Sequence, residues 1–226
     1  MVTTLNCLKQ TIYQSLIMLI SPDVVLQYLK NTGIIVRGVL HIGAHECEEK
    51  EFYNNTLNIN DDCILWIDGN PNKVDQMISR GFQNIYTSVL DECERDIEFN
   101  ITNNTQASSI LTLNHELGYY NNINIIEKIK CRTETLNTFI KRIGKDIKSY
   151  NFWNLDIQGS ELHVLRGSKE LLEQCDVIYM EVNKAEVYKG CGLIDEIDNL
   201  LAIYGFKRIH TLWTDLQWGD ALYVKH

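Results

Sequence analysis

The feature that most constrains the fold is the stretch GVLHIGAHECEE at residues 38–49. Its apolar run ends at Gly43 and suits a buried parallel strand, and from His45 the pattern indicates a helix over residues 46–57. The backbone must therefore reverse tightly at Gly43, which glycine permits. Ligands of open α/β sheets bind where strands end and helices begin, and a glycine-centred first turn commonly holds the adenosine part of a cofactor. We interpret this turn as a cofactor loop.

The residues that follow Gly43 indicate which cofactor the loop holds. A dinucleotide site needs three glycines, so that a pyrophosphate can approach the backbone at a helix N-terminus. Here one glycine is followed by Glu46, Glu48 and Glu49, which would repel phosphate. S-adenosylmethionine carries a sulfonium and an ammonium and no phosphate, so it suits the loop. Acidic residues in a first helical turn can also simply complement the helix dipole. We prefer that interpretation for Glu46 and Glu49 and leave both open for Glu48.

A second acidic signal lies at Asp68, which ends the run CILWID at residues 63–68. Asp68 follows Gly43 by 25 residues, a separation that fits a strand, a helix and a second strand. The carboxylate would then lie beside the first loop and hold a ribose diol. Asp68 could also be a plain turn former before Gly69 and Asn70. Gly43 and Asp68 together are stronger evidence for an adenosine site than either residue alone.

Composition narrows the class of protein. A chain of 226 residues with 45% hydrophobic residues suits one α/β domain at 34–226, preceded by a helical extension at 1–33. A net charge of −9 without a basic cluster argues against a nucleic-acid partner. The seven cysteines form no CxxC motif, so we expect free thiols and a cytoplasmic protein. The apolar run at residues 16–20 is too short to span a membrane, and it lacks the charged start and small-residue cleavage site of a secretion signal.

The remaining pattern predicts alternating strands and helices. We expect helices over residues 5–29, broken near Ser21 and Pro22, and over 71–80 and 135–143, with strands at 63–68 and 84–88. This βαβαβ order predicts a parallel sheet with right-handed crossovers. Two extra strands, at 96–101 and 125–132, flank a polar segment that contains Ser108 and Ser109. That segment is either a functional loop or a disordered insertion.

A second informative stretch is FWNLDIQGSE at residues 152–161. An apolar strand ends at Asp156, and we expect a helix from Gly159 to Gln174, so Asp156 should face the same crevice as Gly43. The next strand, at 177–182, brings Glu181 and Asn183 to that edge. A helix at 193–204 and strands at 206–212 and 221–224 complete the chain. The predicted fold is α/β, a seven-stranded, mostly parallel sheet with helices on both faces.

The chain resembles the FkbM family of S-adenosylmethionine-dependent methyltransferases. The resemblance runs in order through HIGAHECEE, IDGNP, ASSIL, TETLNTFI, NLDIQGSELHVLRG, YMEVNKAEVYKGC and WGDALYV, from residue 38 to residue 225. Each string alone is weak, and their joint occurrence is specific. The resemblance implies a Rossmann-like class I methyltransferase fold and methyl transfer to an oxygen.

The resemblance also implies cofactor contacts at Gly43, Ala44, His45, Asp68, Asn70, Ser88, Val89, Ser108 and Ser109. This sequence departs from the family pattern at His41, where many relatives have Asp, and at Asn137, where the helix usually begins Leu-Asp. The first departure weakens the expectation that an acid beside the loop binds the methionine amine. Glu48 or Asp156 could take that role.

Methyl transfer to an alcohol needs an aligned acceptor and a group that removes its proton. Asp156 is our first candidate for this base or for orienting the substrate, and Glu181 is the second. Asp156 could instead bond the methionine amine or cap the following helix. Asp156, Glu161 and Glu181 could converge on a divalent metal. No sequence pattern requires one, so we expect none.

Substrate contacts are expected at Asn183, Tyr188, Trp218 and Asp220, because aromatic faces beside polar groups suit a sugar ring. These side chains could also simply close the sheet edge. The sequence thus predicts an O-methyltransferase acting on a hydroxyl of a sugar or glycan-related small molecule. The alternatives are a non-catalytic cofactor-binding scaffold and an NAD-dependent sugar-modifying enzyme, although the latter lacks its glycines. A nucleic-acid amine methyltransferase would need Asn/Asp-Pro-Pro-Tyr where residues 154–157 read NLDI.

Overall fold

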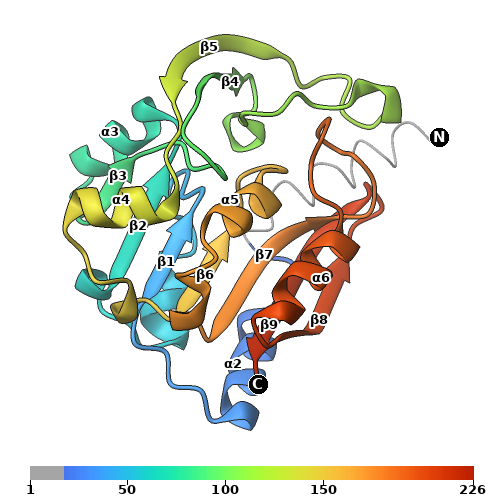
Figure 1. Cartoon of the computed structure of the whole chain (residues 1–226). Helices are drawn as coiled ribbons and strands as arrows, with labels where there is room; N and C mark the ends of the chain where they lie inside the picture. The colour runs from blue at the N-terminus through green and yellow to red at the C-terminus, as the bar shows by residue number, and fades with distance from the viewer. Residues whose placement is uncertain (1–17) are drawn as a thin grey trace.

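A seven-stranded sheet forms the centre of the molecule in the computed structural model, which describes residues 18–226 (Figure 1). Its strands are β1 (Val39–Ile42), β2 (Ile64–Asp68), β3 (Ile85–Thr87), β6 (Phe152–Leu155), β7 (Val177–Asn183), β8 (Phe206–Trp213) and β9 (Trp218–Lys225). They lie in the order β3-β2-β1-β6-β7-β9-β8. Strand β9 runs antiparallel to both its neighbours, and the other pairs are parallel. The predicted mostly parallel sheet is confirmed.

Helices cover both faces of this sheet, as predicted. They are α2 (Pro22–Thr32), α3 (Pro71–Ser79), α4 (Leu136–Ile143), α5 (Glu161–Gly167) and α6 (Ile194–Ile203). Helices α4, α5 and α6 pack on one face in a single apolar cluster that includes Ile42 and Phe139. Helices α2 and α3 pack on the other face, in a cluster that includes Trp66 and Met77. Burial on both faces explains why the central strands read as continuous apolar runs.

The helix ends follow from local side-chain chemistry. Helix α3 begins after Asn70, whose side chain accepts a hydrogen bond from the Asn72 amide, with Pro71 at the first helical position. Helix α4 begins after Thr135, whose hydroxyl accepts from the Thr138 amide. These caps confirm the predicted starts at residues 71 and 135 to within one residue.

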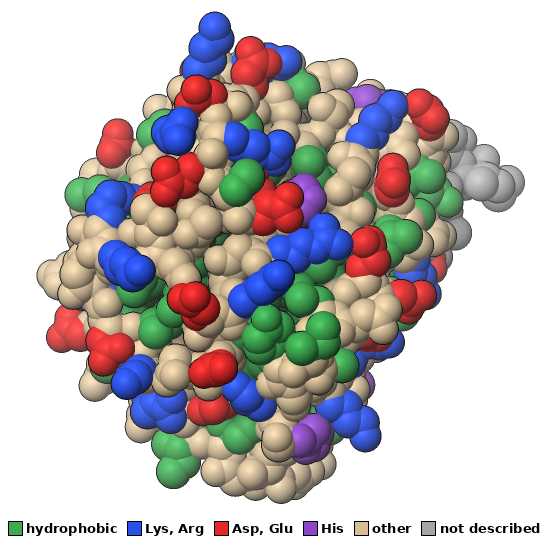
Figure 2. Space-filling model, in the orientation of Figure 1, with side chains coloured by type: hydrophobic (Ala, Val, Ile, Leu, Met, Phe, Trp, Pro, Cys, Tyr) green, Lys and Arg blue, Asp and Glu red, His purple; other side chains and the backbone are tan. Residues whose placement is uncertain are grey.

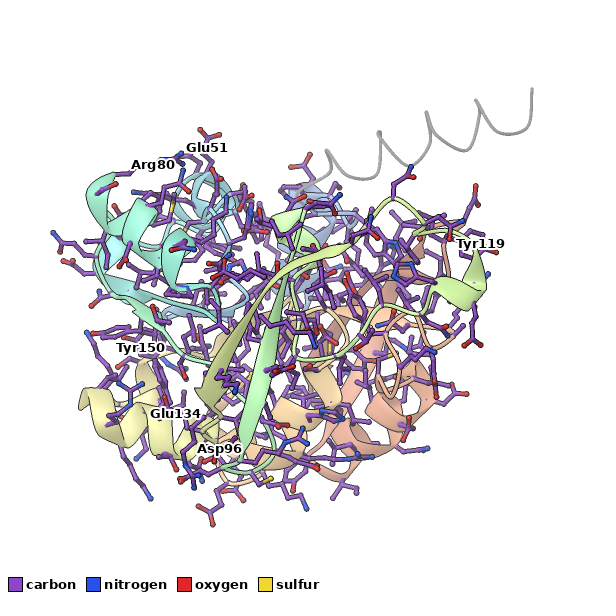
Figure 3. The ribbon with its side chains drawn as sticks, turned by 90° about the horizontal axis from the view of Figure 1, so that it is seen from above. Glu51, Arg80, Asp96, Tyr119, Glu134 and Tyr150 are labelled. Atoms are coloured by element: carbon purple, nitrogen blue, oxygen red, sulfur yellow. The ribbon has the colours of Figure 1, made fainter. Side chains whose placement is uncertain are left out.

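The two additional strands, β4 (Asp96–Thr102) and β5 (Ile125–Arg132), form a separate antiparallel pair. In Figure 1 they lie above the carboxyl ends of the parallel strands, and Figure 3 shows them from above, between Asp96 and the loop that carries Tyr119. The intervening segment, residues 103–124, packs against residues 187–191 through a small apolar cluster that contains Leu113, Tyr120 and Tyr188. It is folded onto the domain, as the functional-loop interpretation requires.

Two predicted helices are wrong in extent. Residues 45–49 form turns, and a short π-helical segment occupies Phe52–Thr56. His45 has φ 41° and Cys47 has φ 55°, which a right-handed helix excludes. Helix α5 starts at Glu161 and stops at Gly167 instead of running from Gly159 to Gln174, and a 3-10 turn follows at Leu172–Gln174.

Two further predictions concern the ends of the chain. The part of the N-terminal helical prediction that covers residues 5–17 lies outside the described residues, and α2 agrees with the part after Pro22. The last strand starts at Trp218 instead of Ala221, because Trp218 pairs with Asn183 across β7 and β9.

The surface and the cysteines bear on the expected partners and compartment. The face in Figure 2 mixes acidic and basic side chains without a broad basic patch. Within residues 18–226, no helix combines the length and apolarity needed to cross a bilayer. The six cysteines of this part of the chain are free thiols, as expected, and Cys7 lies outside it.

Candidate functional site

The site begins where the loops after β1 and β6 cross. These neighbouring strands flank the topological switch point of the sheet, because the chain proceeds from β1 toward one edge and from β6 toward the other. Gly43 has φ 93°, and a Cβ on it would lie 1.7 Å from the carbonyl oxygen of Asp156. Glycine is therefore required at position 43 both for the bend and for the close contact between the two loops.

A cavity of about 390 Å³ opens at this crossing, within the size range of small-molecule sites. Ten of the predicted site residues line it: Gly43, His45, Glu48, Asp68, Ser108, Asp156, Glu181, Tyr188, Trp218 and Asp220. The structure thus brings together residues from β1, β2, β6, β7 and β9 and from the segment between β4 and β5. Among the additional lining residues are Glu49, Thr105 and Gln158.

Six other predicted site residues do not line this cavity. Ser88 and Val89 line a smaller apolar pocket that shares Gly43 and Gly69 with it. Ala44 and Asn183 are each 1% exposed, and Asn70 is the cap of α3. Ser109 contacts a residue of the cavity wall, because its hydroxyl donates to the backbone carbonyl of Gln158 at 2.8 Å.

Asp68 is held rigidly at the end of β2. Its Oδ2 accepts a hydrogen bond from the His45 amide at 2.7 Å, and its Oδ1 accepts from the Asn70 amide at 2.7 Å. Burial raises the pKa of this carboxyl group. Each carboxylate oxygen can accept a further hydrogen bond, so Asp68 is placed to receive two neighbouring hydroxyl groups.

His45 joins the loop after β1 to the segment that covers the cavity. Its Nδ1 lies 2.7 Å from Glu48 Oε1, and its Nε2 lies 2.8 Å from the Thr105 hydroxyl. Although burial opposes ionisation of Glu48, hydrogen bonds from His45 and the Glu46 backbone lower the pKa of the Glu48 carboxyl. Glu48 is thus a charged wall of the cavity.

The other two loop carboxylates lie differently. For Glu46 the dipole interpretation is wrong, because the helical segment starts only at Lys50. Glu49 directly precedes that start, and its carbonyl accepts from the Tyr53 amide at 3.0 Å. Glu46 pairs outside the cavity with Lys73 at 2.5 Å and Arg80 at 3.0 Å. Glu49 turns inward, lines the cavity and is 8% exposed. Burial raises the pKa of Glu49 well above its usual value.

Asp156 and Glu181 are linked by Gln158, which the sequence analysis did not single out. The Gln158 Nε2 donates to Asp156 Oδ1 at 2.6 Å and to Glu181 Oε2 at 3.1 Å. Its Oε1 accepts from the Tyr188 hydroxyl at 2.7 Å. Gln158 has φ 56°, because the backbone bends tightly between Asp156 and Gly159. This bend sets the direction of the Gln158 side chain. The only sequence signal was its position in that bend.

Comparison with known proteins assigns the family. A sequence profile described as the methyltransferase FkbM domain matches residues 29–208. The chain belongs to the FkbM methyltransferase family. No protein of curated function matches the sequence significantly.

A solved structure supports the fold of this FkbM chain. Methyltransferase FkbM from Methylobacillus flagellatus KT is 13% identical with a TM-score of 0.51, over 83% of this chain and 43% of that one. The chain therefore spans less than half the length of that protein. Magnesium protoporphyrin IX methyltransferase from Synechocystis PCC 6803 with bound SAM is 12% identical with a TM-score of 0.41, over 91% and 78% of the two chains.

The family is one of methyltransferases, and the cofactor that the sequence predicts for it is S-adenosylmethionine. The residues of this FkbM chain fit that cofactor. Asp68 can accept hydrogen bonds from a ribose diol, and Gly43 leaves the backbone open to close approach. The ionised Glu48 suits a ligand with an ammonium and a sulfonium group. The single glycine and acidic wall agree less well with a pyrophosphate.

The FkbM chain's departure at His41 is explained by the core. His41 is 1% exposed, and its Nδ1 lies 3.0 Å from the Tyr53 hydroxyl, which also accepts from the Asn154 amide at 2.7 Å. Burial lowers the pKa of His41 to about 3, so the imidazole is neutral. His41 belongs to this buried network and does not line the cavity.

Asn137, the second departure, donates to the Glu170 carboxylate at 3.2 Å on the outer side of α4.

Burial sets the ionisation of the linked carboxyl groups. It raises the pKa of Asp156 to about 6 and that of Glu181 well above its usual value. At neutral pH Asp156 is mostly ionised, whereas burial shifts Glu181 toward its protonated form. Two carboxyl groups with separated pKa values can serve as a base and a hydrogen-bond donor.

Glu161 does not join this pair. Its Oε1 accepts from the backbone amides of Ile157 at 2.9 Å and Gly159 at 3.2 Å, so it holds the bend that presents Gln158. Within residues 18–226, no group of three or more His, Cys, Asp or Glu side chains is arranged to hold a metal ion.

Proposed function

We propose that this protein transfers the methyl group of S-adenosylmethionine to a hydroxyl of a sugar or glycan-related small molecule. The observation that carries the proposal is the hydrogen-bonded set of Asp156, Gln158 and Glu181 in the cavity that Asp68 also lines. A sulfonium methyl is already activated, so the protein must chiefly align the acceptor and remove its proton.

Each group has a defined role in this proposal. The bound cofactor supplies an electrophilic methyl group. Asp156 accepts the hydroxyl proton as the new carbon–oxygen bond forms and the carbon–sulfur bond breaks. Glu181, whose protonated form is favoured by burial, donates a hydrogen bond that orients the acceptor. Trp218 and Tyr188 offer aromatic faces to the C–H groups of a sugar ring.

We also propose a cytoplasmic location and a small-molecule acceptor. The free thiols support a reducing compartment. The mixed surface charge and the net charge of −9 favour a small-molecule acceptor over a nucleic acid.

The proposal is tested by incubating the protein with S-adenosylmethionine and a panel of sugars and glycosides. The expected result is S-adenosylhomocysteine together with an acceptor that has gained the mass of one methyl group. Tight cofactor binding without turnover on any acceptor would favour a non-catalytic scaffold.

A substitution then assigns the base. Asp156→Asn keeps the shape of the side chain and should lower kcat by about 100-fold or more, as loss of a general base does. The affinity for S-adenosylmethionine should stay within about tenfold. Asp96→Asn, at an aspartate whose side chain is 86% exposed, is the matched control and should leave both values unchanged. Equal loss of turnover and cofactor affinity in Asp156→Asn would assign Asp156 to the cofactor instead.

A further inference from the structure

The ionisable side chains of the cavity wall are mainly acidic. Six carboxyl groups line it, those of Glu48, Glu49, Asp68, Asp156, Glu181 and Asp220, and among the described residues no Lys or Arg does. The lysine and arginine side chains nearest along the chain to the site loops are paired elsewhere. Lys50 binds Asp61 at 2.8 Å, and Lys184 lies over the Trp213 ring. Lys73 and Arg80 bind Glu46, and Lys189 binds Glu116 at 2.9 Å. The described wall therefore offers no cation to a ligand.

Two of these carboxyl groups stand together on the acceptor side. Glu181 and Asp220 are directly opposite each other on β7 and β9, and they are 8% and 7% exposed. The Asp220 Oδ2 accepts from the Leu19 amide at 2.7 Å and from the Tyr179 hydroxyl. Within residues 18–226, neither Asp220 Oδ1 nor Glu181 Oε1 has a hydrogen-bond partner. These two oxygens are left to meet the acceptor.

Anion recognition needs groups that this cavity does not supply. Proteins bind phosphate and carboxylate groups through Lys and Arg, or through the backbone amides at a helix N-terminus. The loop after β1 enters turns instead of a helix, and α5 begins with Glu161, whose carboxylate already occupies the amides of the preceding bend. A phosphate in this cavity would face carboxyl groups without a compensating charge.

Resting on the proposed function, we propose that the acceptor is an uncharged or amino-bearing sugar, and that sugars carrying a phosphate, a nucleotide or a carboxylate are excluded. Hydroxyl groups can bond to both the ionised and the protonated carboxyl groups of the wall. An ammonium group would pair with an ionised carboxylate of the wall, such as that of Asp156. Methylation would then act on free sugars, amino sugars or glycosides, after any nucleotide carrier has been removed.

The size of the discrimination follows from Coulomb's law. At an effective dielectric constant of about 20, a like unit charge about 6 Å away lowers affinity by roughly 100-fold. Because at least one wall carboxylate is ionised at neutral pH, we expect a phosphate-bearing acceptor to bind at least about 100-fold more weakly than its uncharged counterpart.

The test uses matched forms of one hexose, namely the methyl glycoside, the amino sugar, the phosphate ester and the nucleoside diphosphate conjugate. Calorimetric titration in the presence of S-adenosylhomocysteine measures binding independently of turnover. The glycoside and the amino sugar should bind, and the phosphate and nucleotide forms should bind at least about 100-fold more weakly, a ratio that shrinks as salt is added. Repeating the set with several hexoses covers the unknown ring configuration.

A variant that removes one carboxyl group tests whether the cavity wall causes this difference in affinity. Above about pH 8 a carboxyl group with a pKa of about 7 is mostly ionised, so the titrations are made there. Asp220→Asn can still accept from the Leu19 amide and the Tyr179 hydroxyl, and it should reduce the discrimination against phosphate by about tenfold. Asp156→Asn, which removes the charge of a carboxyl group with a pKa of about 6, is the second variant if Asp220→Asn does not fold, and Asp96→Asn is the control that should keep the full ratio.

The outcomes separate the two proposals. Binding of the phosphate or nucleotide form as tightly as the glycoside overturns this inference, and so does binding of neither the glycoside nor the amino sugar. Selective binding of the uncharged forms without methyl transfer would support the inference and overturn the proposed function.

Discussion

Replacing Gly43 by alanine tests the loop crossing on which the site is built. The new Cβ would lie 1.7 Å from the Asp156 carbonyl oxygen and 2.6 Å from its carbonyl carbon, so one of the two loops must move. The residue would also have to keep φ near 93°. Because Gly43 and Asp156 both line the cavity, a shift there alters the site directly.

A control at Gly81 separates the cost of the strained φ from the cost of the steric clash. It has φ 90°, and a Cβ on it would meet nothing within 4 Å. Gly81→Ala therefore carries the backbone strain alone, roughly 1–2 kcal/mol. Gly43→Ala adds an overpacking cost of about 1–3 kcal/mol. In a protein of this size 1 kcal/mol corresponds to about 2–4 °C in Tm.

The assay is thermal unfolding combined with calorimetric titration of S-adenosylmethionine. We expect Gly81→Ala to lower Tm by roughly 2–8 °C and to bind the cofactor as the wild type does. Gly43→Ala should lower Tm by several degrees more and weaken cofactor binding at least about tenfold. Equal Tm values with unchanged affinity in both variants would refute the crossing of the two loops.

Three further predictions address ionisable groups of the cavity, and a fourth addresses the bridge between them. Asp68→Asn should weaken S-adenosylmethionine binding by about 10- to 100-fold in calorimetry, because a charge-assisted hydrogen bond to the ribose is lost. Because the pKa of Asp156 is raised to about 6, kcat/KM should fall with decreasing pH below 6 and level off above it, and a flat profile would exclude Asp156 as the base. Burial raises the pKa of Asp220 to about 7, so the native state holds a proton that the unfolded chain loses near pH 4. Stability should therefore fall as pH rises from about 4 to 7, and Asp220→Asn should flatten this dependence in denaturant titrations. Tyr188→Phe removes the hydrogen bond to Gln158 and should lower kcat several-fold while the cofactor affinity stays constant.

The parts of the fold that local patterns specify could be predicted. Continuous apolar runs identified the parallel strands, and the cap residues identified the starts of α3 and α4. The carboxyl ends of parallel strands meet at one edge, which is why Asp68, Asp156 and Glu181 could be assigned to one crevice.

The missed features depend on contacts between distant residues. The turns after Gly43 are set by hydrogen bonds from His45 to Asp68 and Thr105, which no helical periodicity encodes. Glu49 lines the cavity, which its place before a helix did not indicate. Gln158 gained its position from a bend that Glu161 holds through two backbone amides.

A crystal structure with S-adenosylhomocysteine tests the central claim most directly. The ribose hydroxyls should lie within hydrogen-bond distance of Asp68, and the sulfur should face the space between Asp156 and Glu181. An adenosine bound away from Asp68, or a sulfur turned from these two carboxyl groups, would contradict it.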